Sequence, residues 1–250
     1  MNLKPIFFGV FAFFALESTV PAFAGSITVT VLGTANPYLA GQPSGTPCCS
    51  GDSAPGQSPT YVPATVTPGS TLTFSGSGGF NYGGGAPASS LDGDNDGTSL
   101  TYIYSQTADY GTGIAGALGV NVDGLVGVFL TGAQPSGPVP SQLDYTALGL
   151  GAASYTPGLN QIFWIGDGLT GLGSGSVQTF LVPTSATRLF LGTVDGSGWN
   201  NNSGIGTVTV SGVTLSAGVP EPSTWALMLT GFVGLGLASR RAARKVAKVA

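Results

Sequence analysis

Short runs of alternating polar and apolar residues, separated by Gly and Pro, limit the possible folds of this chain more than any other feature. The 250 residues include 42 Gly and 17 Pro, the two residues that most weaken helices. Residues 26–32 and 206–211 alternate strictly, as half-buried strands do. The sequence therefore predicts an all-β fold with long loops.

The predicted strands are spread over the whole central region without a fixed repeat period, which argues against a solenoid. Apart from 26–32 and 206–211, they are 61–66, 71–74, 100–104, 125–130, 162–165, 177–182, 187–194 and 212–215. Short strands separated by Gly/Pro turns are typical of a β-sandwich. We expect a single jelly-roll or galactose-binding-like sandwich over residues 25–218.

The first 24 residues have the organisation of a secretory signal peptide. Lys4 forms a charged start, residues 6–16 are apolar, and Ala22-Phe23-Ala24 is an A-x-A site. We expect signal peptidase to cleave after Ala24.

The last residues, 219–250, combine a proline-bracketed acid, an apolar segment and a basic tail. Val219, Pro220, Glu221 and Pro222 precede an apolar run over 225–238, which five Lys or Arg residues follow. As a helix this run would span about 21 Å, less than the hydrocarbon core of about 30 Å. The cations favour a cytoplasmic location for this end. A stop-transfer element or an uncut short tail anchor would both fit.

This arrangement resembles the PEP-CTERM sorting signal of Gram-negative bacteria, a motif also labelled an ice-binding protein C-terminal domain. The resemblance implies that an exosortase, a membrane protease-transpeptidase, recognises the Pro-Glu-Pro core and removes the tail. It further implies a precursor in the inner membrane and a product at the cell surface, in the outer membrane or in the extracellular matrix.

The charge of the central region excludes some partners. Residues 25–218 contain one Arg, nine Asp and no Lys, Glu or His, a formal net charge of −8. Nucleic-acid binding needs Lys and Arg to displace counterions, so we expect no nucleic-acid partner. Metal cations are the natural counter-charge, and Asp and Asn oxygens suit calcium. Solvated turns would account for several of the Asp residues.

Cys48 and Cys49 are adjacent inside a Pro-, Gly- and Ser-rich loop. A vicinal disulfide or pairing between two chains would both fit an oxidising, exported location. Metal or redox chemistry would need further ligands or a CxxC spacing, and the sequence has neither.

A first candidate calcium loop starts at Asp92, where the sequence reads Asp-Gly-Asp-Asn-Asp-Gly. This D-x-D-x-D-G spacing is that of the first half of an EF-hand loop. The twelfth position is Ile103, where an EF-hand needs a bidentate Glu, so an acidic solvated loop is the competing interpretation.

A second candidate lies over residues 195–204, where Asp195 and three Asn share a Gly-rich backbone. Calcium takes six to eight oxygen ligands, which such side chains and carbonyls can supply. An ordinary Asn/Gly turn is the alternative.

Around this loop the chain resembles the calcium-dependent galactophilic lectins of the PA-IL type. An apolar strand ending in Asp195 is followed by Trp199 and Asn201-Asn202-Ser203-Gly204, and residues 68–74, 79–83 and 180–183 are also similar. The resemblance implies calcium ligands at Asp195, Asn201 and Asn202 and at the backbone carbonyls of Tyr82 and a residue near Gly198. Sugar hydroxyls complete the shell in those lectins.

Two departures set this chain apart from the lectins. The loop is one residue shorter, and their sugar-contacting His has no counterpart in a chain without His. Trp199 would either stack on a sugar ring or pack beneath the loop.

The sequence thus predicts an exported, non-catalytic surface or matrix protein that binds carbohydrate with the help of calcium, with extracellular polysaccharide as a partner. The alternative is a secreted glycan-active enzyme that uses two Asp carboxylates. Without His, a Ser–His or Cys–His nucleophile is excluded.

Overall fold

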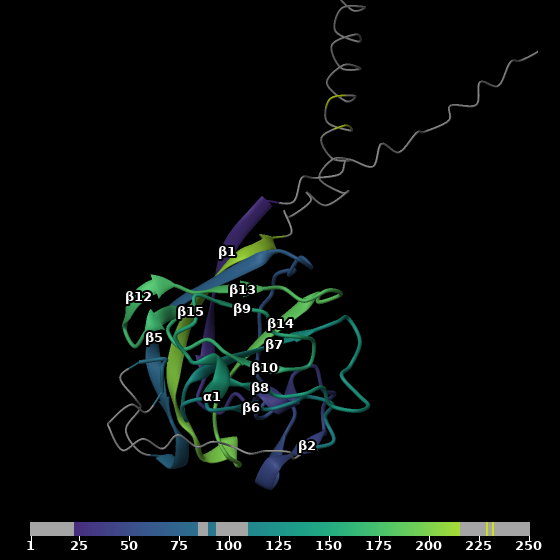
Figure 1. The fold of residues 1–250 in the computed structure, drawn as a ribbon. Coiled ribbons are helices and arrows are strands. Elements are labelled where there is room, and N and C mark those ends of the chain that lie inside the picture. The colour runs from purple at the N-terminus through teal and green to yellow at the C-terminus, as the bar shows by residue number, and fades with distance from the viewer. Residues whose placement is uncertain (1–22, 85–89, 94–109, 216–228, 230–231, 233–250) are drawn as a thin grey trace, which may run out of the picture. The chain divides into compact units, whose positions relative to one another are not determined.

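The computed structural model describes residues 23–84, 90–93, 110–215, 229 and 232 (Figure 1). Residues 23–216 form one compact unit. The sorting motif 219–222 and most of the signal peptide lie outside the described residues, as does nearly all of the apolar run 225–238. Ala24 is described, and it lies within the first strand, opposite Thr214. Cleavage after Ala24 would therefore leave that strand to start at Gly25.

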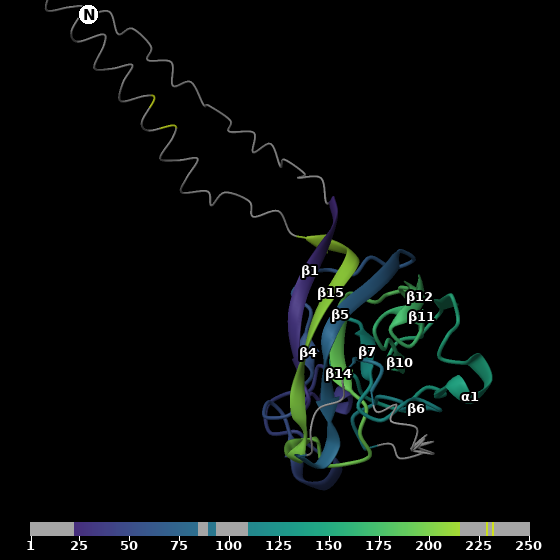
Figure 2. The same ribbon diagram turned by 90° about the vertical axis from the view of Figure 1, so that its left-hand side faces the viewer.

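The larger of two main sheets has five strands in the order β1, β15, β5, β13, β9. Their bounds are β1 Phe23–Leu32, β15 Ser203–Leu215, β5 Thr71–Asn81, β13 Thr179–Leu181 and β9 Ser154–Tyr155. All neighbours are antiparallel except β13 and β9. Figure 2 shows β1, β15 and β5 side by side in one layer, with β7 and β10 of the second sheet to one side.

The second sheet has four strands in the order β10, β7, β14, β4. They are β10 Ile162–Trp164, β7 Leu125–Leu130, β14 Arg188–Thr193 and β4 Thr60–Tyr61. All six residues of β7 are buried, because it lies between two strands and its side chains are apolar. The apolar run 125–130 is confirmed as a central strand.

Three two-stranded pairs and short helical turns connect the sheets. The pairs are β2 Pro47–Cys48 with β3 Asp52–Ser53, β6 Ala117–Leu118 with β8 Leu143–Asp144, and β11 Leu169–Gly171 with β12 Ser174–Val177. Among the described residues, the helix α1 spans Tyr145–Leu148, and four 3₁₀ turns span η1 Pro37–Leu39, η2 Cys49–Gly51, η3 Tyr82–Gly84 and η4 Trp199–Asn201.

Side chains from both sheets belong to one buried cluster. The Phe74 ring of the larger sheet lies 5.0 Å from the Phe180 ring and 6.4 Å from the Phe163 ring of β10. Phe163 also stacks on Phe129 of β7 at 4.8 Å. Burial of these apolar side chains stabilises the packing of the two sheets. Within the described part of the chain, no helix has the length and apolar character needed to cross a membrane.

Several predicted boundaries are wrong. The predicted strand 71–74 is too short, because β5 continues to Asn81, where β15 still pairs with it. The predicted strands 206–211 and 212–215 are one strand, with a register shift opposite Gly25 and Ser26. The Pro-, Gly- and Ser-rich segment around Cys48 and Cys49, expected as a loop, contains η1, β2, η2 and β3. The predicted strand 100–104 lies outside the described residues.

Candidate functional site

The loop between β14 and β15 is built around the turn η4, Trp199–Asn201. Gly198 precedes this turn with a left-handed backbone (φ 83°), which glycine adopts without steric cost. No side chain of the loop itself caps the turn. The side chains of Asn200 and Asn201 are exposed, and Trp199 and Asn202 are buried.

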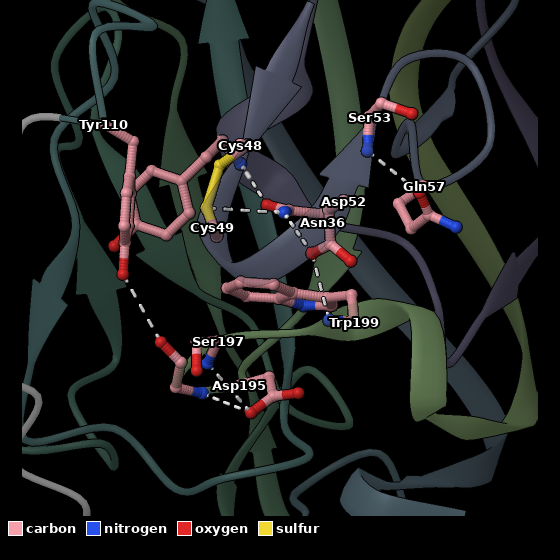
Figure 3. Close-up of a disulfide and its surroundings, with 12 residues drawn as sticks. Asn36, Cys48, Cys49, Asp52, Ser53, Gln57, Tyr110, Asp195, Ser197 and Trp199 are labelled. Carbon is pink, nitrogen blue, oxygen red and sulfur yellow. Dashed lines mark hydrogen bonds between the residues drawn. A yellow bond between two sulfur atoms is a disulfide. The ribbon is translucent and has the colours of Figure 1, made fainter.

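The turn is capped from outside the loop by Asp52 of β3 (Figure 3). The backbone N–H of Trp199 donates to Asp52 Oδ2 and that of Asn200 donates to Oδ1, both at 3.0 Å. Asp52 is 1% exposed, so these bonds compensate the burial of its carboxylate. A negative charge at the start of a helical turn is also favourable.

Asn36 and the two cysteines hold Asp52 in place. Asn36 Nδ2 donates to Asp52 Oδ2 at 3.0 Å and also contacts Cys49 Sγ at 3.7 Å. Cys48 and Cys49 form a vicinal disulfide, so of the two pairings left open by the sequence the structure contains the intrachain one. Figure 3 shows the disulfide, Asn36 and Asp52 grouped on one side of the Trp199 indole.

Asp195 lies two residues after the end of β14 and is half-buried. Its Oδ1 accepts from the backbone N–H groups of Gly196 and Ser197. Burial raises the pKa of the Asp195 carboxyl, and the nearby Asp52 charge adds to the rise, whereas hydrogen bonds from Asn202 and the backbone oppose it. Two carboxylates thus lie close enough to repel one another.

Asn202 closes the loop and contributes an oxygen that has no hydrogen-bond partner. Its Nδ2 donates to the Gly33 carbonyl at 3.3 Å. Its Oδ1 is buried and unpartnered, although a buried amide oxygen without a partner costs about 1–3 kcal/mol. The unpartnered oxygen belongs to a side chain whose amide also donates to the Asp195 carboxyl, and a donor or a cation would stabilise that oxygen.

The other residues expected as ligands, Tyr82, Gly198 and Asn201, belong to the turns η3 and η4 or directly precede them. The turn η3, which begins at Tyr82, contacts η4, because Asn81 pairs with Ser203 across β5 and β15. Gly198 is buried at the start of η4, and Asn201 points an exposed side chain from it. The structure therefore brings the segments of all five expected ligands to one end of the larger sheet.

Trp199 does not offer a face to solvent. Its side chain is 1% exposed, its Nε1 donates to the Thr193 carbonyl at 3.0 Å, and its ring meets Tyr38 edge-on at 5.9 Å. The expectation that Trp199 stacks on a sugar ring is therefore wrong, because the indole fills the space beneath the loop.

The donor set of this end of the sheet suits a hard cation. The Asp195 carboxylate and the Asn202 oxygen are the ligand types that calcium takes. A cavity of about 20 Å³, whose mostly apolar lining includes Asp195 and Trp199 but not Asn202, has room for one water. In the part of the chain that the structure describes, no group of three or more His, Cys, Asp or Glu side chains forms a metal cage.

Asp92, the first residue of the other candidate calcium loop, is 3% exposed. Its Oδ1 accepts from the Asp167 N–H at 2.9 Å, and burial raises the pKa of its carboxyl. Residues 94–97 of that motif lie outside the described residues.

Asp52 was not expected at the 195–202 loop, because it is distant in sequence and only its burial and hydrogen bonds reveal its role.

No protein-family model and no curated protein matches this chain.

Proposed function

We propose that this protein is an exported, non-catalytic module of the cell surface or extracellular matrix, with a β-sandwich fold and a calcium-dependent carbohydrate site at the 195–202 loop. The observation that carries the proposal is the Asp195–Asn202 pair. The partly buried Asp195 carboxylate there accepts a hydrogen bond from Asn202, whose side-chain oxygen is buried and unpartnered, and the charge of Asp52 acts on the same carboxylate. A divalent cation would satisfy the oxygen and relieve the repulsion.

The carbohydrate part of the proposal uses the exposed edge of the same loop. Asn201 is exposed beside the buried Asn202, so a cation held there would keep positions open to sugar hydroxyls. Contact through Trp199 forms no part of this proposal, since its ring is buried. Export and exosortase sorting are supported by the terminal sequence segments alone.

The test is a thermal melt of residues 25–218 in excess calcium and in EDTA. An ion that binds only the folded state adds about 2.7 kcal/mol to stability at a hundredfold excess over Kd, which raises Tm by several degrees. We expect Asp195→Asn to abolish this shift. Asp144→Asn, on an exposed carboxylate that caps α1, should leave it intact.

Equal melting temperatures in calcium and EDTA for the unaltered domain would refute the metal site. If calcium raises Tm, binding of methyl α-D-galactoside with and without calcium then tests the carbohydrate part separately. A calcium shift that persists in Asp195→Asn would show that the ion binds elsewhere.

A further inference from the structure

A second cavity, of about 230 Å³, lies apart from the 195–202 loop. It is enclosed by the β11–β12 hairpin on one side, by the segment 150–151 on another, and by Asp92, Asn121 and Trp164. Leu172, 49% exposed, stands at its rim, so the cavity opens to solvent. Because one water needs only about 10–15 Å³ of such space, this volume accommodates a small molecule.

The walls of the cavity are fixed by hydrogen bonds before any ligand enters. Asn121 Nδ2 donates to the Asp92 carbonyl at 3.0 Å, and Gln178 Nε2 donates to the Leu150 carbonyl at 2.9 Å. Thr170 Oγ1 accepts from the Ser176 N–H across the hairpin at 2.9 Å. A preformed site loses little conformational entropy on binding.

The lining chemistry restricts the ligand class. The polar residues of the lining are Asp92, Asn121 and Thr170, and the remaining wall is largely apolar, with Leu150, Leu169, Leu172 and Trp164. No Lys, Arg or His lines the cavity, and the buried Asp92 would repel phosphates and carboxylates. The polar groups suit a ligand that donates hydrogen bonds, and the leucines suit its C–H surface.

We propose that this cavity binds one neutral, polyhydroxylated unit, a single saccharide residue, by hydrogen bonds to Asp92, Asn121 and Thr170 and by contact with Leu172. This binding does not require calcium and does not depend on the site proposed above. The module would then hold sugar at two independent places.

The experiment follows backbone amide NMR shifts of residues 25–218 in EDTA during titration with the methyl α-D-glycosides of glucose, galactose and mannose. We expect at least one glycoside to shift Asn121 and Thr170 in a saturable way. Leu172→Ala should weaken that binding at least about fivefold, since it removes a large apolar contact. The matched control is Leu181→Ala, whose side chain is similarly exposed at 42% and lies outside the cavity lining.

The remaining outcomes each decide the question. Binding that needs calcium and disappears in Asp195→Asn places the sugar at the loop and overturns the cavity proposal without harming the calcium site. Ethylammonium, a small cation, tests whether the cavity prefers a positive charge. If it shifts the same amide signals in a saturable way and no glycoside does, the ligand is not a saccharide. Equal weakening in Leu172→Ala and Leu181→Ala, or no shift with any glycoside, also refutes the proposal.

Discussion

The carboxylate of Asp52 fixes a turn that lies 147 residues further along the chain. It accepts hydrogen bonds from two backbone N–H groups of that turn and from Asn36. All three donors would be left in a buried or partly buried place if the carboxylate were removed. The loop conformation therefore depends on one side chain that the loop itself does not contain.

Replacement of Asp52 by Ala should lower the free energy of unfolding by about 3–5 kcal/mol, because three donors lose their acceptor. Urea denaturation measures the change. Asn200→Ala is the control: its exposed side chain can be removed while its N–H still bonds to Asp52, so its effect should stay within about 0.5 kcal/mol. Similar losses in the two variants would contradict this role for Asp52.

The raised pKa of Asp195 makes a pH prediction for the protein in EDTA. The Asp195 carboxyl binds its proton more tightly in the folded state than in the unfolded state. Its ionisation therefore lowers the free energy of unfolding as the pH rises from 3.8 through the raised pKa. Asp195→Asn removes the cost. In EDTA at neutral pH we expect this variant to be more stable than the unaltered protein.

The stability difference should shrink as the pH falls through the raised pKa and vanish below the ordinary value of 3.8, where the carboxyl is protonated in both states. Chemical denaturation at a series of pH values in EDTA measures it. A variant that is less stable than the unaltered protein at neutral pH would contradict the burial argument. In excess calcium the order of the two proteins should reverse, if the proposed ion binds.

At the scale of elements, strands with a local apolar pattern were predictable and strands rich in glycine were not. The alternating run 26–32 and the apolar runs within 125–130 and 187–194 correspond to β1, β7 and β14. The second half of β5 contains glycines at 76, 78 and 79 and has no such signal. It is a strand only because β15 supplies its hydrogen-bond partners.

The candidate site was predictable to a similar extent. The sequence located Asp195 and Asn202 at the loop, because carboxylate and carboxamide groups on a Gly-rich backbone are recognisable locally. It gave no indication of Asp52, whose role depends on a long-range approach of β3 to η4. The burial of Trp199 also depends on tertiary packing, here against Tyr38.

β5 and β15 approach each other closely at Gly204, which predicts that a side chain there lowers the stability of the larger sheet. Gly204 has φ 93°, and a Cβ there would collide with the Gly79 carbonyl oxygen. Gly69 has a similar φ of 77° but open space around it. Gly69→Ala should cost about 1–2 kcal/mol for backbone strain alone, whereas Gly204→Ala should cost about 3 kcal/mol or more, because β5 must move.

Thermal or urea unfolding of the two variants makes this comparison. The two replacements create the same residue at a similar backbone angle, so the difference between them isolates the packing of the strands. Equal costs would mean that β5 and β15 separate easily at this end, and the structural role assigned to Gly204 would be withdrawn.

At the scale of the whole molecule, the core and not the disulfide holds the fold together. Cys48 and Cys49 are adjacent, so their bond closes almost no loop, and the stabilisation expected from chain entropy is only about 1 kcal/mol. Reduction with a phosphine should therefore lower Tm by only a few degrees. A collapse of the fold on reduction, seen by near-UV circular dichroism, would contradict this expectation.

The pairing of β1 with β15 has a mechanical consequence. Phe23 lies opposite Leu215, so the chain enters and leaves the sheet at neighbouring points (Figure 1). A force that pulls these two points apart loads the β1–β15 hydrogen bonds one after another, as in a zipper, instead of all together. In the proposed precursor, held through both ends, tension would peel β1 away first. Cutting either end would release that load and leave the strand in its place.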